Sequence, residues 1–77
     1  MLKKKLIDFI SERTGVAELD AETPLFSEGL MDSMSVLDLT TFVEQQTEVL
    51  FPAADVTLEN VDSINRILTY VSKNRTE

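Results

Sequence analysis

The hydrophobic positions near the start of the chain repeat with the spacing of a helix. Four apolar residues share one face of this segment: Leu2, Leu6, Phe9 and Ile10. The pattern predicts a helix over residues 2–13. Gly15 follows where a left-handed residue commonly ends a helix, so we expect it to act as the C-cap.

A second apolar stripe predicts a helix over residues 33–47. We expect its buried face to consist of Val36, Leu39, Phe42 and Val43. Leu37 flanks this stripe, and we expect it to lie in the core. Met34 is assigned with equal weight to the core or to a docking surface, where a flexible thioether suits several partners. Asp38, Glu44 and Glu48 add a thin acidic edge.

The clearest helical stripe lies near the end of the chain. Ile64, Ile67, Leu68 and Val71 follow i, i+3, i+4, i+7 spacing, so a helix is expected to begin at Asp62 or Ser63. A short helix over residues 58–61, capped by Thr57, is predicted before it. We expect Tyr70 to pack against the bundle with its hydroxyl at the surface.

Two connections carry enough apolar residues to join the core. Residues 16–32 form a long link whose apolar side chains favour packing over free movement. Residues 49–52, Val-Leu-Phe-Pro, predict an extended link that plugs the bundle. The fold class is therefore all-α: a small antiparallel bundle of three main helices and one short helix, in a single domain over residues 1–77.

Composition narrows the range of partners. The 77 residues include 14 acidic and 7 basic side chains, for a net charge of −7. Such a protein is repelled by nucleic acids and anionic membranes and is attracted to basic surfaces. No apolar run approaches the roughly 20 residues of a membrane span. The lack of cysteine fits a reducing compartment, so we expect a cytoplasmic protein without membrane or nucleic-acid partners.

Several kinds of chemistry are missing from the sequence. Without His or Cys, it contains no Ser–His or Cys–His nucleophile pair. It also lacks the spacing of a calcium loop and a glycine-rich phosphate loop. We therefore expect neither an enzyme nor a metal site.

The most informative polar residues are Asp32 and Ser33. Asp32 is predicted to be the N-cap of the second helix, because a short carboxylate accepts hydrogen bonds from a free first turn. Ser33 then lies at the positive end of the helix dipole, where a phosphate ester is favoured. Asp62-Ser63 repeats this dipeptide but lacks the glycine and apolar approach, so we interpret it as a helix cap alone.

Residues 29–34, Gly-Leu-Met-Asp-Ser-Met, precede an apolar helix in a short acidic chain. In this setting they resemble the acyl carrier protein family, which includes peptidyl and aminoacyl carrier (thiolation) domains. The resemblance extends over residues 2–71. It implies that Ser33 carries a 4′-phosphopantetheine arm derived from coenzyme A, attached by a phosphopantetheinyl transferase that Asp32 assists.

The same resemblance implies a set of docking residues and partners. We expect Met34, Leu37 and Asp38 to form the partner-facing rim beside Ser33, so Leu37 has two competing assignments. Basic patches on acyl- or aminoacyl-loading and processing enzymes would meet this rim. The carrier is expected to act as a monomer and to hold its cargo as a thioester.

Departures from the fatty-acid carriers favour a specialised pathway. Their second helix is typically richer in glutamate and ends in an aromatic–glycine pair, whereas this one contains Thr40, Thr41, Gln45 and Gln46 and ends in Thr47-Glu48. A polyketide, non-ribosomal peptide or aminoacyl pathway is therefore preferred. The alternatives are a carrier for fatty-acid synthesis and an acidic helical adaptor without a prosthetic group.

Overall fold

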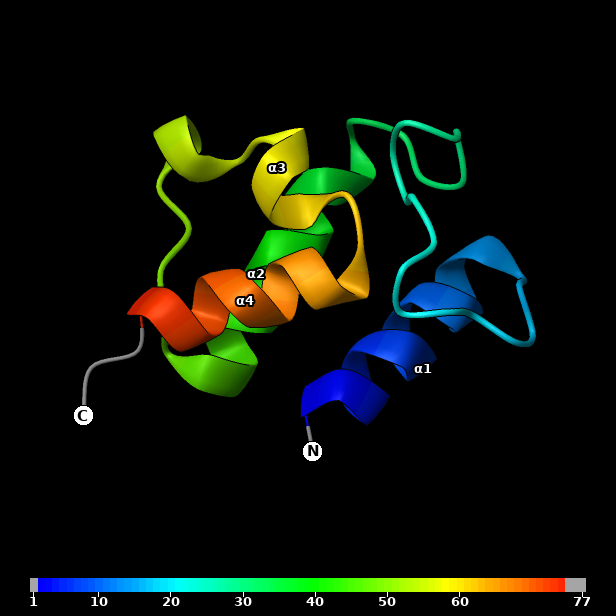
Figure 1. Cartoon of the computed structure of the whole chain (residues 1–77), viewed down its shortest axis with the longest axis horizontal. Coiled ribbons are helices and arrows are strands. Elements are labelled where there is room, and N and C mark those ends of the chain that lie inside the picture. Colours follow the sequence, from blue (N-terminus) through cyan, green and yellow to red (C-terminus); the bar gives the residue numbers. More distant parts are fainter. Residues whose placement is uncertain (1, 75–77) are drawn as a thin grey trace.

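The computed structural model describes residues 2–74 and is helical throughout its regular elements (Figure 1). The elements in chain order are α1 (Leu2–Thr14), α2 (Ser35–Thr47), the 3-10 turn η1 (Ala53–Asp55), α3 (Leu58–Val61) and α4 (Ile64–Asn74). This confirms the prediction of three main helices and one short helix. The turn η1 is an addition to it.

Helices α1 and α2 run antiparallel and touch along a regular row of side chains. Lys5 Nζ donates to Gln46 Oε1 at 3.0 Å, and the rings of Phe9 and Phe42 stack with centroids 4.3 Å apart. Arg13 then meets Asp38 at 2.9 Å. The contacting residues are four positions apart in each helix and run in opposite directions, so the two helices meet about once per turn.

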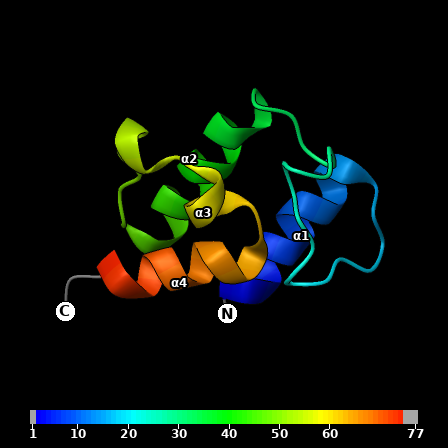
Figure 2. The same cartoon turned by 45° about the horizontal axis from the view of Figure 1, so that its top comes forward.

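The predicted apolar stripes meet in one core. Helix α4 packs against α1 and α3, and Figure 2 shows the short helix α3 leading directly into α4. The largest fully buried side chains come from all three main helices and from the first long loop: Leu6, Ile10, Leu25, Leu39, Val43, Ile64 and Ile67.

Leu37 is the clearest exception to the predicted core. Its side chain is 65% exposed, while Leu39, two positions later, is completely buried. Two residues span about 200° of a helix, so the two side chains point to nearly opposite sides. The core assignment of Leu37 is wrong. Met34 is 77% exposed, which settles its assignment in favour of the surface.

Both long connections pack as predicted. Leu19, Leu25 and Met31 of the first loop are buried. In the second, Val49 and Phe51 are buried while Leu50 between them is exposed, as expected for an extended chain whose side chains alternate. These segments therefore help to build the core.

Three local expectations need comment. Gly15 has a φ of 76° directly after α1, which confirms the left-handed C-cap. Helix α2 begins at Ser35, two residues later than predicted, and α4 begins at Ile64. Tyr70 packs against the bundle with its ring buried, as predicted, and its hydroxyl donates to Asp55 Oδ2 at 2.7 Å, a partner that the sequence did not reveal.

Among the described residues, no helix has both the length and the apolar character needed to cross a membrane. Residues 2–74 likewise contain no group of three or more His, Cys, Asp or Glu side chains arranged to hold a metal ion.

Candidate functional site

A capped turn leads the chain into α2. The Asp32 carboxylate accepts hydrogen bonds from Ser35 N at 3.0 Å and Ser35 Oγ at 3.1 Å. Between them, Met34 has helical dihedral angles, with φ −73° and ψ −31°. Asp32 therefore occupies the capping position predicted for it, although regular helical hydrogen bonding begins only at Ser35.

The cap also fixes the charge of Asp32. Hydrogen bonds from the backbone N–H and then the hydroxyl of Ser35 hold the pKa of this carboxyl below its ordinary value. The group is thus ionised at neutral pH and accepts both bonds as a carboxylate.

Ser33 lies within this turn with an exposed side chain. Other serines are committed to the structure: Ser35 Oγ donates to Asp32, and Ser27 Oγ donates to Asp62 Oδ2 at 2.7 Å. Ser63, the serine of the second Asp-Ser pair, is only 3% exposed, and its Oγ accepts a hydrogen bond from Arg66 N. Ser63 is therefore a cap of α4, as predicted.

Asp62 has a contact that the sequence did not predict. Its carboxylate accepts hydrogen bonds from Phe26 N and from Ser27 N and Oγ. The partners lie more than thirty residues away in the chain, and no local pattern signals such a pairing.

Ser33 stands at the rim of an apolar pocket of about 510 Å³. Three segments form its walls: the end of the first loop, the start of α2, and the stretch that enters and forms α3. The lining residues are Phe26, Gly29, Met31, Asp32, Ser33, Val36, Val56, Thr57, Leu58 and Val61. The structure thus places an accessible hydroxyl beside an apolar hollow.

Three large apolar side chains on these segments are exposed. Leu58, which lines the pocket at the start of α3, is 54% exposed, and Met34, just before α2, and Leu37 of α2 are 77% and 65% exposed. The sequence did not identify Leu58 as a surface residue; it is the first residue of the four-residue helix α3.

Asp38, the third predicted docking residue, has an internal partner. It is paired with Arg13 of α1 at 2.9 Å, and both side chains remain partly open to solvent. Glu44 from the same acidic edge accepts a hydrogen bond from Phe51 N at 2.7 Å. Part of the predicted acidic edge therefore holds the bundle together.

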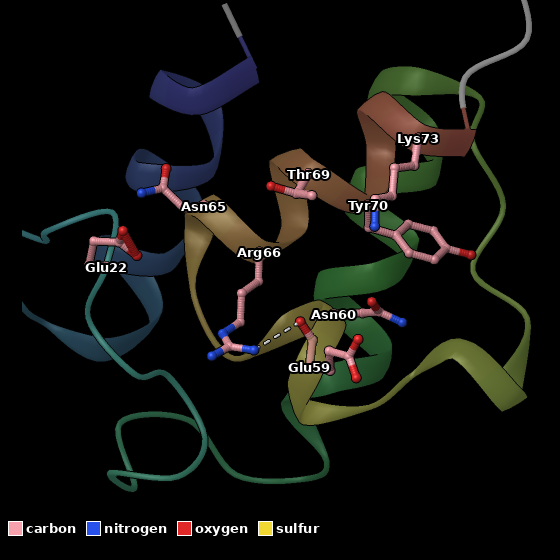
Figure 3. Close-up of a pocket in the computed structure, with 8 residues that line it drawn as sticks. All are labelled: Glu22, Glu59, Asn60, Asn65, Arg66, Thr69, Tyr70 and Lys73. Carbon is pink, nitrogen blue, oxygen red and sulfur yellow. Dashed lines mark hydrogen bonds between the residues drawn. The ribbon is translucent and has the colours of Figure 1, made fainter.

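A second hollow, of about 390 Å³, lies along α3 and α4 (Figure 3). Two carboxylates, Glu22 and Glu59, and two cations, Arg66 and Lys73, line it together with neutral side chains. Its charges offset one another, and Arg66 Nη1 donates to the Glu59 carbonyl at 3.3 Å across the junction of the two helices. This hydrogen bond links α3 to α4, and Ser33 does not line the hollow.

Comparison with known proteins agrees with these features. A family model described as the phosphopantetheine attachment site matches residues 4–71. A probable acyl carrier protein, PigG of Serratia sp., is 29% identical over 76 residues, which cover 95% of this chain and 87% of that protein. A D-alanyl carrier protein of Lactococcus lactis subsp. lactis is 27% identical over 78 aligned positions, covering 99% of each chain.

The family match extends over most of the chain, and the helical bundle with its capped α2 agrees with it. The chain therefore belongs to the phosphopantetheine carrier proteins, in which 4′-phosphopantetheine is attached covalently.

Proposed function

We propose that Ser33 is the residue to which the phosphopantetheine arm is attached. The observation that carries this proposal is the position of its exposed side chain on a capped turn at the rim of an apolar pocket. The neighbouring serines Ser27, Ser35 and Ser63 are each engaged in hydrogen bonds of the fold.

The residues around Ser33 fit such an arm. The hydroxyl is accessible, the start of α2 favours an anionic phosphate, and the pocket offers apolar walls to whatever follows it. When bound, the arm supplies a terminal thiol that holds an acyl or aminoacyl cargo as a thioester. The chain itself supplies the attachment oxygen, and Asp32 keeps the turn that presents it in place.

The attachment is a transfer of the phosphopantetheinyl group from coenzyme A. A bond forms between Ser33 Oγ and phosphorus, and the bond from that phosphorus to the nucleotide part of coenzyme A breaks. The hydroxyl proton leaves to a base of the transferase. The carrier has no His or Cys of its own, so we propose that it performs no catalysis and depends on separate enzymes.

We further propose a specialised pathway for the cargo. The curated relatives include a probable acyl carrier protein and D-alanyl carrier proteins, and the second helix of this chain is poor in glutamate. The chain acts as a single, monomeric domain. It acts in the cytoplasm, because the thiol of its arm must stay reduced to accept cargo. Its charge of −7 favours basic protein partners over nucleic acids and anionic membranes.

The partner-facing rim consists of Met34, Leu37 and Asp38. The exposure of Met34 and Leu37 beside Ser33 supports this assignment, and Asp38 remains open enough to exchange Arg13 for a basic group of a partner. Phosphopantetheinyl transferase and the loading enzymes would meet the same rim.

Intact mass spectrometry tests the attachment site. The chain is incubated with coenzyme A and a broad-specificity phosphopantetheinyl transferase, and fragmentation maps any added group. We expect the wild-type chain and a Ser72→Ala control, which loses an exposed serine of α4, to gain one phosphopantetheine group. The Ser33→Ala variant should gain none. A group that still appears on Ser33→Ala overturns the assignment of Ser33, and a folded wild-type chain that gains none supports the adaptor alternative.

The apolar pocket supports a second candidate function, that of a carrier of fatty-acid intermediates. Its volume of about 510 Å³ leaves room for a short acyl chain, whereas a small amino acid needs no such hollow. Comparing the stability of the chain loaded with an octanoyl group and with an alanyl group separates the two. Stabilisation by the octanoyl group alone favours the fatty-acid role.

A further inference from the structure

Asp62, between α3 and α4, is bonded to three consecutive residues of the first loop. Its Oδ1 accepts hydrogen bonds from Phe26 N at 2.8 Å and Ser27 N at 3.0 Å, and its Oδ2 accepts one from Ser27 Oγ at 2.7 Å. The backbone carbonyl of the same residue accepts a fourth from Leu25 N at 2.6 Å. One residue thus holds the loop from the far end of the sequence.

The loop that Asp62 holds runs directly into the attachment turn. Met31 N donates to the Leu25 carbonyl at 2.7 Å, and Gly29 N donates to the Phe26 carbonyl at 3.1 Å, so residues 25–31 close upon themselves. Phe26, Gly29 and Met31 form one wall of the Ser33 pocket. Fixing residues 25–27 therefore fixes both that wall and the approach to Ser33.

The other end of the contact is firmly placed. Asp62 N, directly after α3, donates to the carbonyl of Leu58, the first residue of that helix, and Ser63 Oγ accepts from Arg66 N at the start of α4. Figure 3 shows Arg66 reaching across this junction to Glu59. Hydrogen bonds from both α3 and α4 therefore fix the position of Asp62, and Asp62 in turn holds the first loop.

The Asp62 carboxylate is ionised while it accepts the hydrogen bonds of the loop. Partial burial alone would raise the pKa of Asp62, but the hydrogen bonds from Ser27 and Phe26 and the charge of Arg66 outweigh it and lower the pKa below its ordinary value. Hydrogen bonds to an ionised acceptor are stronger than those between neutral groups.

We propose that Asp62 is a positioning residue for the modification of Ser33: by holding residues 25–27 it keeps the pocket wall and the turn at Ser33 in the shape that the transferase recognises. The inference rests on the proposed function of Ser33. Asp62 acts through the loop and touches neither Ser33 nor the group transferred to it.

The test uses Asp62→Asn, which keeps the size of the side chain but removes its charge and one acceptor oxygen. Asp20→Asn is the matched control, because Asp20 Oδ1 also accepts a loop N–H, that of Glu22, away from the Ser33 pocket. Ser27→Ala is a milder variant, which removes one of the three side-chain bonds of Asp62. Steady-state rates of modification are measured against carrier concentration, and amide exchange is followed in parallel.

We expect Asp62→Asn to raise the KM for the carrier about tenfold with kcat nearly unchanged. This is the result if only roughly a tenth of the molecules keep the loop conformation that the transferase binds. Amide exchange should quicken in residues 25–33 and stay unchanged in α4. Ser27→Ala should show a smaller rise in KM, and Asp20→Asn none. A role in overall stability alone would instead quicken exchange in all the helices.

The outcomes separate the two proposals. Modification of the wild-type chain at Ser33, with an unchanged KM in both Asp62→Asn and Ser27→Ala, overturns the inference alone. An equal rise in KM for Asp20→Asn also overturns it. If the folded wild-type chain is not modified at Ser33, the proposed function fails, and the inference fails with it.

Discussion

Arg13 Nη1 lies 2.9 Å from Asp38 Oδ2, and this ion pair closes the row of contacts between α1 and α2. The same guanidinium stands 4.9 Å from the centre of the Phe9 ring, which stacks on Phe42. A residue expected to face partners is thus part of the packing of the bundle. Because the Arg13 and Asp38 side chains are 42% and 57% exposed, water weakens the pair and leaves it open to competition.

A double-mutant cycle measures this pair. Asp38→Asn, Arg13→Gln and the double variant are compared with the wild-type chain by urea unfolding. We expect a coupling free energy of about 0.2–1 kcal/mol, the range of exposed ion pairs, which shrinks as salt is added. Lys4→Gln, which alters an exposed lysine of α1, should change the free energy of unfolding very little. A coupling near zero at low salt would show that the pair contributes nothing to stability.

Two leucines of α2 separate packing from docking. Leu39 is fully buried, so Leu39→Ala should lower the free energy of unfolding by about 2–5 kcal/mol. Leu37 is 65% exposed, so Leu37→Ala should change it by less than about 0.5 kcal/mol. Urea unfolding gives both values. If Leu37→Ala proves as costly as Leu39→Ala, Leu37 belongs to the core after all.

The helices were predictable because their signals are local. Each main helix buries one face, and a period of 3.6 residues in the apolar positions reveals that face directly. The Asp32 cap was predictable for the same reason, since its partner Ser35 is three residues away. Leu37 was misplaced because its apolar side chain alone suggested the core, whereas the same period sets it about 200° from Leu39, on the exposed side of α2.

The missed features depend on residues far apart in the chain. Asp62 meets Phe26 over a separation of 36 residues, and Tyr70 meets Asp55 over 15. Nothing in the neighbourhood of either residue reveals its partner. The start of α2 was placed too early because Ser35 N donates to the Asp32 carbonyl in a turn, and Met34 in that turn already has helical dihedrals before the regular hydrogen bonds begin.

Replacing Asp32 with alanine should loosen the first turn of α2. The variant loses the carboxylate acceptor of Ser35 N and Ser35 Oγ but keeps the backbone bond from Ser35 N to the carbonyl of residue 32. The Ser35 amide should therefore exchange faster, while amides in α4 should not change. Hydrogen exchange followed by NMR measures both. Asp38→Ala, which removes a carboxylate inside α2, is the control. A Ser35 amide that exchanges in Asp32→Ala as it does in the wild-type chain contradicts the assigned side-chain cap.

The same cap should respond to acid. The pKa of Asp32 is lowered in the folded chain, so the ionised form is favoured by folding. Its contribution is present above the ordinary carboxyl pKa and is lost as the pH falls through the lowered folded value. A carboxyl titration by NMR should therefore give a midpoint for Asp32 below that of a free aspartate. A midpoint at or above the free value contradicts the geometry of the turn.

Tyr70 gives the opposite test, at alkaline pH. Burial of the ring, the hydrogen bond to Asp55 and the charges of Asp55 and Glu44 raise the pKa of its hydroxyl from 10.0 to about 12. Below pH 10 the group is protonated in both the folded and the unfolded chain. Between the two values only the unfolded chain ionises, so the free energy of unfolding should fall as the pH rises.

Tyr70→Phe isolates this effect. At neutral pH it should cost about 1 kcal/mol, because the Asp55 carboxylate loses its donor at 2.7 Å. The stability difference between wild type and variant should then shrink above pH 10, since phenylalanine does not titrate. Tyr70 is the single tyrosine in a chain without tryptophan, so the absorbance of its phenolate reports this residue alone. A midpoint near 10 in the folded chain would mean that the hydroxyl is solvated and that η1 is not tied to α4.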